Sequence, residues 1–127
     1  MCTGLDQMIM RMKGEPDPSI KDACAVLDGF DKRLLQWISE NGVAAIASDN
    51  LAVEAVGKQV TPDSGGSNLP LHELCLFRLG IHLGELWYLE ELAQWLKANN
   101  RSRFLLTAPP LRLTGAVGSP VTPIASV

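Results

Sequence analysis

The sequence predicts a single α/β domain, and three observations support this prediction. The chain has 127 residues, a length that suits one hydrophobic core. Hydrophobic residues make up 46% of the chain and charged residues 20%, which is a balance typical of globular proteins. A helical pattern over residues 31–41 is followed, after Gly42, by the short apolar run 43–47. A helix followed by a short buried strand is typical of α/β architecture.

The N-terminal segment is predicted to be an amphipathic helix that ends by Gly14. Its apolar residues recur at i, i+3, i+4 and i+7, which places them on one helix face, and we expect the methionines to face inward. These residues are Leu5, Met8, Ile9 and Met12. The following segment, 15–18, contains two prolines and is expected to be a stiff connector.

The next helix has recognisable signals at both ends. Asp31 can cap it, because a carboxylate there accepts hydrogen bonds from the first turn, and Gly42 suits the left-handed residue that closes it. We expect residues 43–47 to form a buried strand. The polar residues 48–50 then lie at the carboxyl end of that strand, where open α/β sheets bind ligands. Turn and capping roles for these three residues are the favoured interpretation.

The second half of the chain alternates loops with regular structure. Residues 61–70 form a polar loop, which we expect to be mobile at its Gly-Gly centre. Helices are predicted at 71–79 and 89–98, a buried strand at 104–108, and turns with a final strand within 115–127.

Composition and charge exclude several classes of function. The net charge is −3 and the basic residues are scattered, so no nucleic-acid partner is expected. No apolar run reaches the roughly 18 residues that a membrane span needs, so we expect a soluble, cytoplasmic protein without a membrane partner. The cysteines Cys2, Cys24 and Cys75 lack the spacing of a zinc knuckle or a disulfide scaffold. We expect Cys24 and Cys75 to pack as small hydrophobic residues.

The chemistry-bearing residues gather near the only two histidines, His72 and His82. His72 begins the predicted helix that Gly80 ends, so the chain can turn back and bring Glu85 towards it. An imidazole and a carboxylate suit a zinc or manganese ion. The alternative is that His72 only begins the helix and that Glu85 pairs with a base such as Arg78. His82 is expected to point away from the core.

Residues 71–85 and the closing segment 111–125 resemble the C-terminal half of the cyclase family, which includes bacterial kynurenine formamidases and isatin hydrolase. Residues 3–4 and 42–50 are similar to the same family. Residues 1–127 would then be one domain that resembles the C-terminal half of a cyclase-family domain. The resemblance implies a partial swivelling β/β/α fold with a mixed sheet and flanking helices. It also implies a zinc or manganese site that activates water to hydrolyse an amide-like bond.

The resemblance matches His72 and Glu85 to the late metal-ligand pair of the family. The family's upstream ligand motif, His-x-Gly-Thr-His-x-Asp-x-Pro, has no counterpart in the chain, and no catalytic residue is assigned. The favoured hypothesis is a truncated cyclase-like protein without a complete catalytic site, which retains small-ligand binding and holds metal at low occupancy. The alternative is a metal-dependent hydrolase of cyclic amide or acyl substrates whose site another chain completes. Exposed sheet edges predict a homo-oligomer, a dimer or larger.

Overall fold

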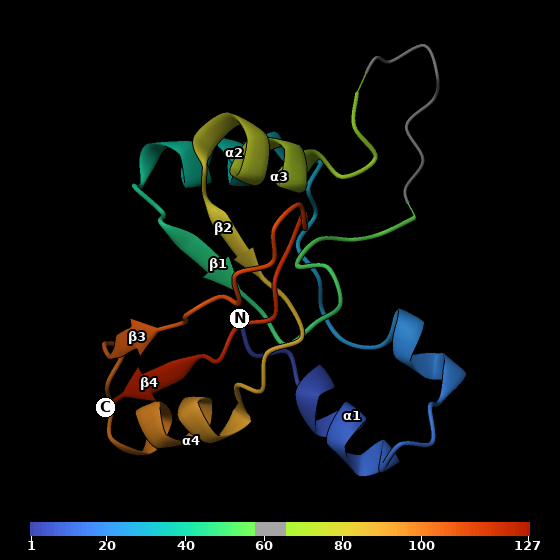
Figure 1. The fold of residues 1–127 in the computed structure, drawn as a ribbon, viewed down its shortest axis with the longest axis vertical. Helices are drawn as coiled ribbons and strands as arrows, with labels where there is room; N and C mark the ends of the chain where they lie inside the picture. Colours follow the sequence, from blue (N-terminus) through green and yellow to red (C-terminus); the bar gives the residue numbers. More distant parts are fainter. Residues whose placement is uncertain (58–65) are drawn as a thin grey trace. The chain divides into compact units, whose positions relative to one another are not determined.

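The structure is a computed structural model that describes residues 1–57 and 66–127. The chain forms two compact units, residues 1–90 and 91–127 (Figure 1). Both units combine helix and strand, so the predicted α/β class is confirmed. Residues 61–65 of the predicted polar loop lie outside the described residues.

The first unit contains a parallel pair of strands and the helices that precede them. Its elements, in chain order, are α1 (Leu5–Met12), the 3₁₀ helix η1 (Pro18–Asp22), α2 (Lys32–Glu40), β1 (Ala45–Ala47), α3 (Pro70–His72), the π-helix η3 (Glu73–Leu79) and β2 (His82–Gly84). Strands β1 and β2 pair in parallel, with Ala45 opposite His82 and Ala47 opposite Gly84. This pairing brings the residues that follow the two strands to the same edge of the sheet.

Helix α2 begins and ends where its sequence signals predicted. Asp31 is the N-cap, and its Oδ1 accepts a hydrogen bond of 2.9 Å from the backbone N–H of Arg33. Asn41 is the C-cap, and Gly42 follows with φ at 62°, a conformation that costs glycine little.

The core of the first unit lies between α2, α3, η3 and the two strands. It consists of five buried apolar residues, Ile38, Val53, Leu71, Cys75 and Ile81. Partly buried residues of β1 and β2, Ile46 and Leu83, pack against it. Each fully buried aliphatic side chain contributes about 1.5–3 kcal/mol. Cys75 packs in this core as expected, whereas the expectation for Cys24 is wrong, because Cys24 is exposed in a bend with φ at 71°.

The predicted helix at 71–79 exists, but most of it is a π-helix rather than an α-helix. Only Pro70–His72 is α-helical, and Glu73–Leu79 has the wider π winding. The carbonyl of Cys75 accepts hydrogen bonds from both Gly80 and Ile81, which ends the helix at the left-handed Gly80. An apolar pattern of helical period does not separate the two windings, so the sequence could not predict this difference.

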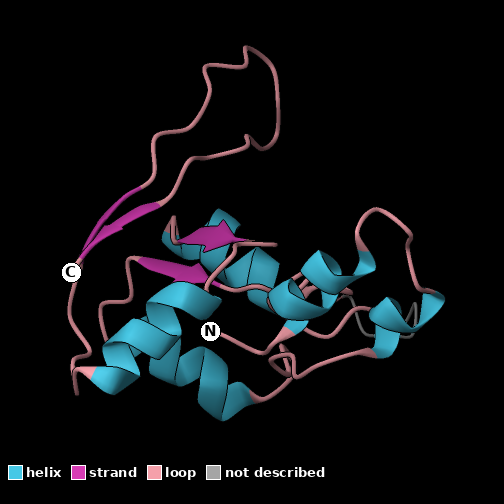
Figure 2. Cartoon of the chain, turned by 90° about the horizontal axis from the view of Figure 1, so that it is seen from below, coloured by secondary structure: helices cyan, strands magenta, loops and turns pink. Residues whose placement is uncertain are grey.

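The second unit contains most of α4 (Glu90–Ala98) and the antiparallel strands β3 (Leu105–Thr107) and β4 (Ile124–Ser126). Figure 2 shows β3 and β4 as a ladder with a long connecting loop. The final strand was predicted, but the prediction that residues 104–108 form a buried strand is wrong. Every residue of β3 is exposed, because a two-stranded ladder alone covers neither of its faces.

Two further expectations concern the sheet and the membrane. The described strands form one parallel pair and one antiparallel pair rather than a single mixed sheet. Among the described residues, no helix has the length and apolar character needed to cross a membrane.

Candidate functional site

A buried carboxylate, that of Glu54, organises the start of α3. Glu54 is only 1% exposed and lies beside Leu27 in an isolated β-bridge. Its Oε2 accepts a hydrogen bond of 3.1 Å from the backbone N–H of Leu71. Its Oε1 accepts one of 2.8 Å from the backbone N–H of His72 and lies 2.7 Å from Nδ1 of the same residue. Glu54 therefore fixes both the backbone and the imidazole of His72.

Gly29 provides the space that the Glu54 carboxylate occupies. A Cβ atom on Gly29 would lie 1.9 Å from Oε2 of Glu54 and 3.2 Å from the backbone nitrogen of Leu71. Any side chain here would displace the carboxylate or the start of the helix. The glycine is thus required by close approach rather than by an unusual backbone angle.

The structure brings together the predicted pair, His72 and Glu85. Nε2 of His72 lies 3.1 Å from Oε1 of Glu85, which follows the carboxyl end of β2. The two side chains are 22% and 35% exposed, so the pair is accessible from solvent. The alternative pairing of Glu85 with Arg78 is wrong, because the Arg78 guanidinium binds Glu73 instead, with Nε 3.1 Å from Oε1. His82 is exposed, as expected, and is not part of this pair.

Both nitrogens of the His72 ring face carboxylates, those of Glu54 and Glu85. A neutral imidazole carries one N–H and one lone pair, whereas an ionised carboxylate only accepts hydrogen bonds. If Nδ1 donates to Glu54, the lone pair on Nε2 faces an oxygen of Glu85 with no proton between them. A proton between the two atoms, or a bound metal ion, relieves this repulsion.

The donor set fits a zinc or manganese ion in part. A tetrahedral zinc ion holds imidazole nitrogen and carboxylate oxygen at about 2.0–2.2 Å each, which separates the two ligand atoms by about 3.3 Å. The observed separation of 3.1 Å between Nε2 of His72 and Oε1 of Glu85 is close to this value. Two ligands are fewer than the three protein ligands of a catalytic zinc site.

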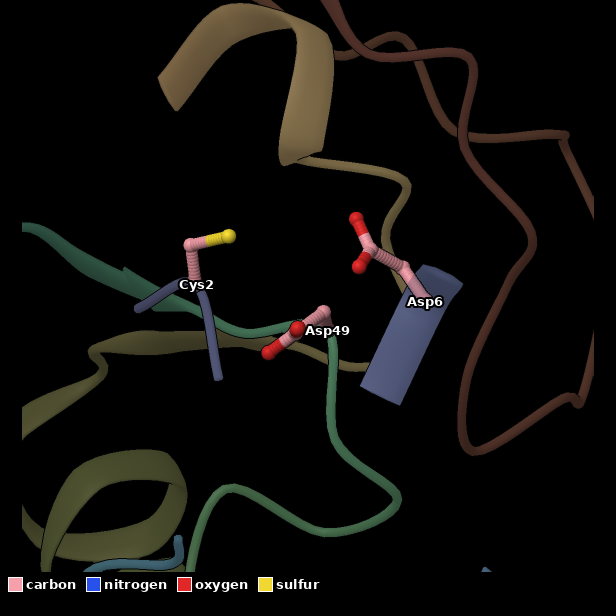
Figure 3. Close-up of side chains that lie close together, drawn as sticks. All are labelled: Cys2, Asp6 and Asp49. Atoms are coloured by element: carbon pink, nitrogen blue, oxygen red, sulfur yellow. The ribbon is translucent and has the colours of Figure 1, made fainter. Parts of the chain in front are cut away.

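A second cluster, Cys2–Asp6–Asp49, was not predicted from the sequence (Figure 3). One potential ligand atom from each of its three residues lies within 4.8 Å of the others, so their distances alone would allow a metal ion. Sequence spacing gave no signal for the cluster, because Asp49 lies more than forty positions beyond Cys2 and Asp6.

The carboxylate of Asp49 is already occupied by hydrogen-bond donors. It accepts bonds from the backbone N–H groups of Thr3 (2.8 Å), Gly4 (2.7 Å) and Leu5 (3.1 Å), and from the Thr3 hydroxyl (2.8 Å). Burial by itself raises the pKa of Asp49, but the bonds from Thr3 and Gly4 together hold it below its usual value. Asp49 thus anchors the start of α1, which is a capping role of the kind favoured for residues 48–50.

Asp6 has the corresponding role at the start of α4. Its Oδ2 accepts hydrogen bonds from the backbone N–H groups of Leu89 (2.8 Å) and Glu90 (2.9 Å). The Cys2 thiol lies 3.6 Å from Oε2 of Glu90. Burial raises the pKa of Cys2, and the bond to Glu90 and the charges of Asp49 and Asp6 raise it further. This cluster therefore consists of two helix-capping carboxylates and a protonated thiol.

The chain is similar to a protein of known structure. No family model matches the chain, and no curated protein does. The crystal structure of a novel cyclase is similar to it, with 41% sequence identity and a TM-score of 0.61 over 73% of this chain and 28% of that one. The chain thus spans less than a third of the solved chain. The similarity supports the predicted relationship to the cyclase family, and the protein is cyclase-like.

Proposed function

We propose that this chain supplies two ligands, Nε2 of His72 and a carboxylate oxygen of Glu85, to a divalent metal site. The observation that carries the proposal is the 3.1 Å approach of Nε2 of His72 and Oε1 of Glu85, with the other nitrogen of the ring 2.7 Å from Glu54. The same two residues were matched to family ligands from the sequence. Zinc and manganese both suit this ligand mixture.

The proposed site would let the bound ion polarise a water molecule or a carbonyl group, as in metal-assisted hydrolysis. The chain's own contribution is to hold the ligands. Glu54 orients the ring of His72, and the turn after β2 presents Glu85 beside it. Because both side chains are partly exposed, a small molecule could approach the ion from solvent.

With only two ligands, the chain by itself should bind metal weakly and lack hydrolase activity. We therefore favour a cyclase-like protein that binds metal and a small ligand without catalysing a reaction alone. The second candidate is a hydrolase of cyclic amide or acyl substrates, similar to kynurenine formamidase and with a swivelling β/β/α domain. In that case another chain, such as a second copy in a homo-oligomer, completes the site.

Metal titration of the purified protein tests the proposal. Zinc and manganese binding is measured by isothermal titration calorimetry for the wild type and for His72→Ala and Glu85→Gln. Each substitution should weaken binding at least tenfold, because it removes one of two ligands. The matched control is His82→Ala, which removes the exposed histidine outside the pair and should leave affinity unchanged. Equal affinity in the wild type and in His72→Ala would refute the proposed site.

A further inference from the structure

We infer that Glu54 is a positioning residue, which holds His72 in the tautomer with the proton on Nδ1 and so makes Nε2 the metal-binding atom. The part of this inference that concerns metal rests on the proposed function. The tautomer itself is a property of the chain and is measured without metal.

The contacts of Glu54 define which ring nitrogen carries the proton. An ionised carboxylate offers only acceptors, so the 2.7 Å contact between Oε1 and Nδ1 of His72 requires a hydrogen atom on Nδ1. A contact this short is typical of a bond to a charged acceptor. In the neutral ring, the lone pair is then on Nε2, on the side of Glu85.

The Glu54 carboxylate is fixed in position, so the acceptor that it presents to Nδ1 of His72 is fixed as well. Both of its oxygens accept backbone N–H groups, from Leu71 and His72. Its own backbone is fixed on either side, because Leu27 donates to the carbonyl of Val53 and accepts from the N–H of Ala55. Gly29 leaves a space that the carboxylate fills, so the side chain is confined as well as bonded.

This arrangement has a known chemical consequence. A histidine that binds a metal usually donates its second N–H to a carboxylate or carbonyl, which orients the ring and raises its basicity. Loss of such a partner typically weakens metal affinity by about 10–100-fold. Glu54 has the position, the burial and the charge of this partner, although nothing in its sequence context distinguishes it from other glutamates.

The first test is the tautomer of His72 in the metal-free wild type. The chain has only two histidines, so the imidazole ¹⁵N spectrum contains two ring systems, and exposed His82 is the internal reference. At pH 9, where histidine is ordinarily neutral, His72 should show a protonated Nδ1 and an unprotonated Nε2. A proton found on Nε2 of His72 would overturn the inference, whatever any variant does.

The second test is Glu54→Gln, which removes the charge and places an amide N–H₂ against at least one backbone donor. Zinc affinity should fall about 10–100-fold, and the His72 ring should become a mixture of tautomers while His82 stays unchanged. The matched control is Asp31→Asn, the same loss of a helix-capping carboxylate at a site remote in sequence from the pair. Asparagine caps a helix about as well as aspartate, so neither readout should change.

The outcomes separate the inference from the proposed function. If Glu54→Gln keeps the wild-type tautomer and affinity, Glu54 has only a structural role and the inference is wrong. If the wild type binds no metal but His72 carries its proton on Nδ1 and loses that preference in Glu54→Gln, the positioning role holds and the proposed function fails.

Discussion

The Glu54–His72–Glu85 cluster and the Cys2–Asp6–Asp49 cluster both gather acidic side chains at the start of a helix, but their acceptors are used differently. In the Cys2–Asp6–Asp49 cluster, both aspartates accept several backbone N–H groups, so their charge is balanced by the protein itself. In the other cluster, the backbone N–H groups donate to buried Glu54. When the His72 ring is neutral and donates from Nδ1 to Glu54, no proton lies between its Nε2 and Oε1 of Glu85. Proximity of ligand atoms is therefore a weaker criterion for a metal site than the count of donors and acceptors.

The largest effect is expected from Asp49→Ala, which breaks the hydrogen bonds that hold the start of α1. The backbone N–H groups of Thr3, Gly4 and Leu5, which are partly or fully buried, would lose their acceptor, and we expect a loss of about 3 kcal/mol in the free energy of unfolding. Chemical denaturation measures this loss. Zinc affinity at His72, measured well below the denaturation midpoint, should be unchanged. A stability change below about 0.5 kcal/mol would show that the Cys2–Asp6–Asp49 cluster is not a structural device.

Gly29→Ala is expected to lower the free energy of unfolding less than Asp49→Ala does, but to disturb the His72–Glu85 pair more. The added methyl group would collide with Oε2 of Glu54, so the carboxylate must move while its charge is retained. We expect a loss of about 2 kcal/mol, typical of overpacking, together with altered imidazole signals of His72. The control is Gly118→Ala, because a Cβ there meets no atom within 4 Å. If Gly29→Ala leaves the His72 signals unchanged, the confined position of Glu54 is not what orients the ring.

The sequence predicted those features whose signals are local. Asp31 and Gly42 delimit α2 because caps depend on residues within one turn. His72 and Glu85 could be expected to meet because one short helix, a single glycine turn and a short strand separate them. The structure brings them to 3.1 Å, although metal binding at the pair remains a prediction.

The missed features depend on contacts between distant residues. Glu54 acts on a helix 17–18 positions away, and a lone glutamate in a loop has no pattern that indicates such a partner. Asp6 caps a helix more than 80 positions away. The exposure of β3 was missed for a related reason, since an apolar strand is buried only if another element covers it.

The smallest effect is expected at Cys2, whose labelling rate should not change when zinc is added. To bind zinc, Cys2 would have to lose a proton that burial and three neighbouring carboxylates hold, and both aspartates would have to give up backbone donors. Mass spectrometry of iodoacetamide-labelled protein measures the rate, with exposed Cys24 as the internal reference. Zinc that slows labelling of Cys2 but not of Cys24, and no longer does so in Asp6→Asn, would make the Cys2–Asp6–Asp49 cluster a metal site. The count of donors and acceptors would then have failed to separate the two clusters.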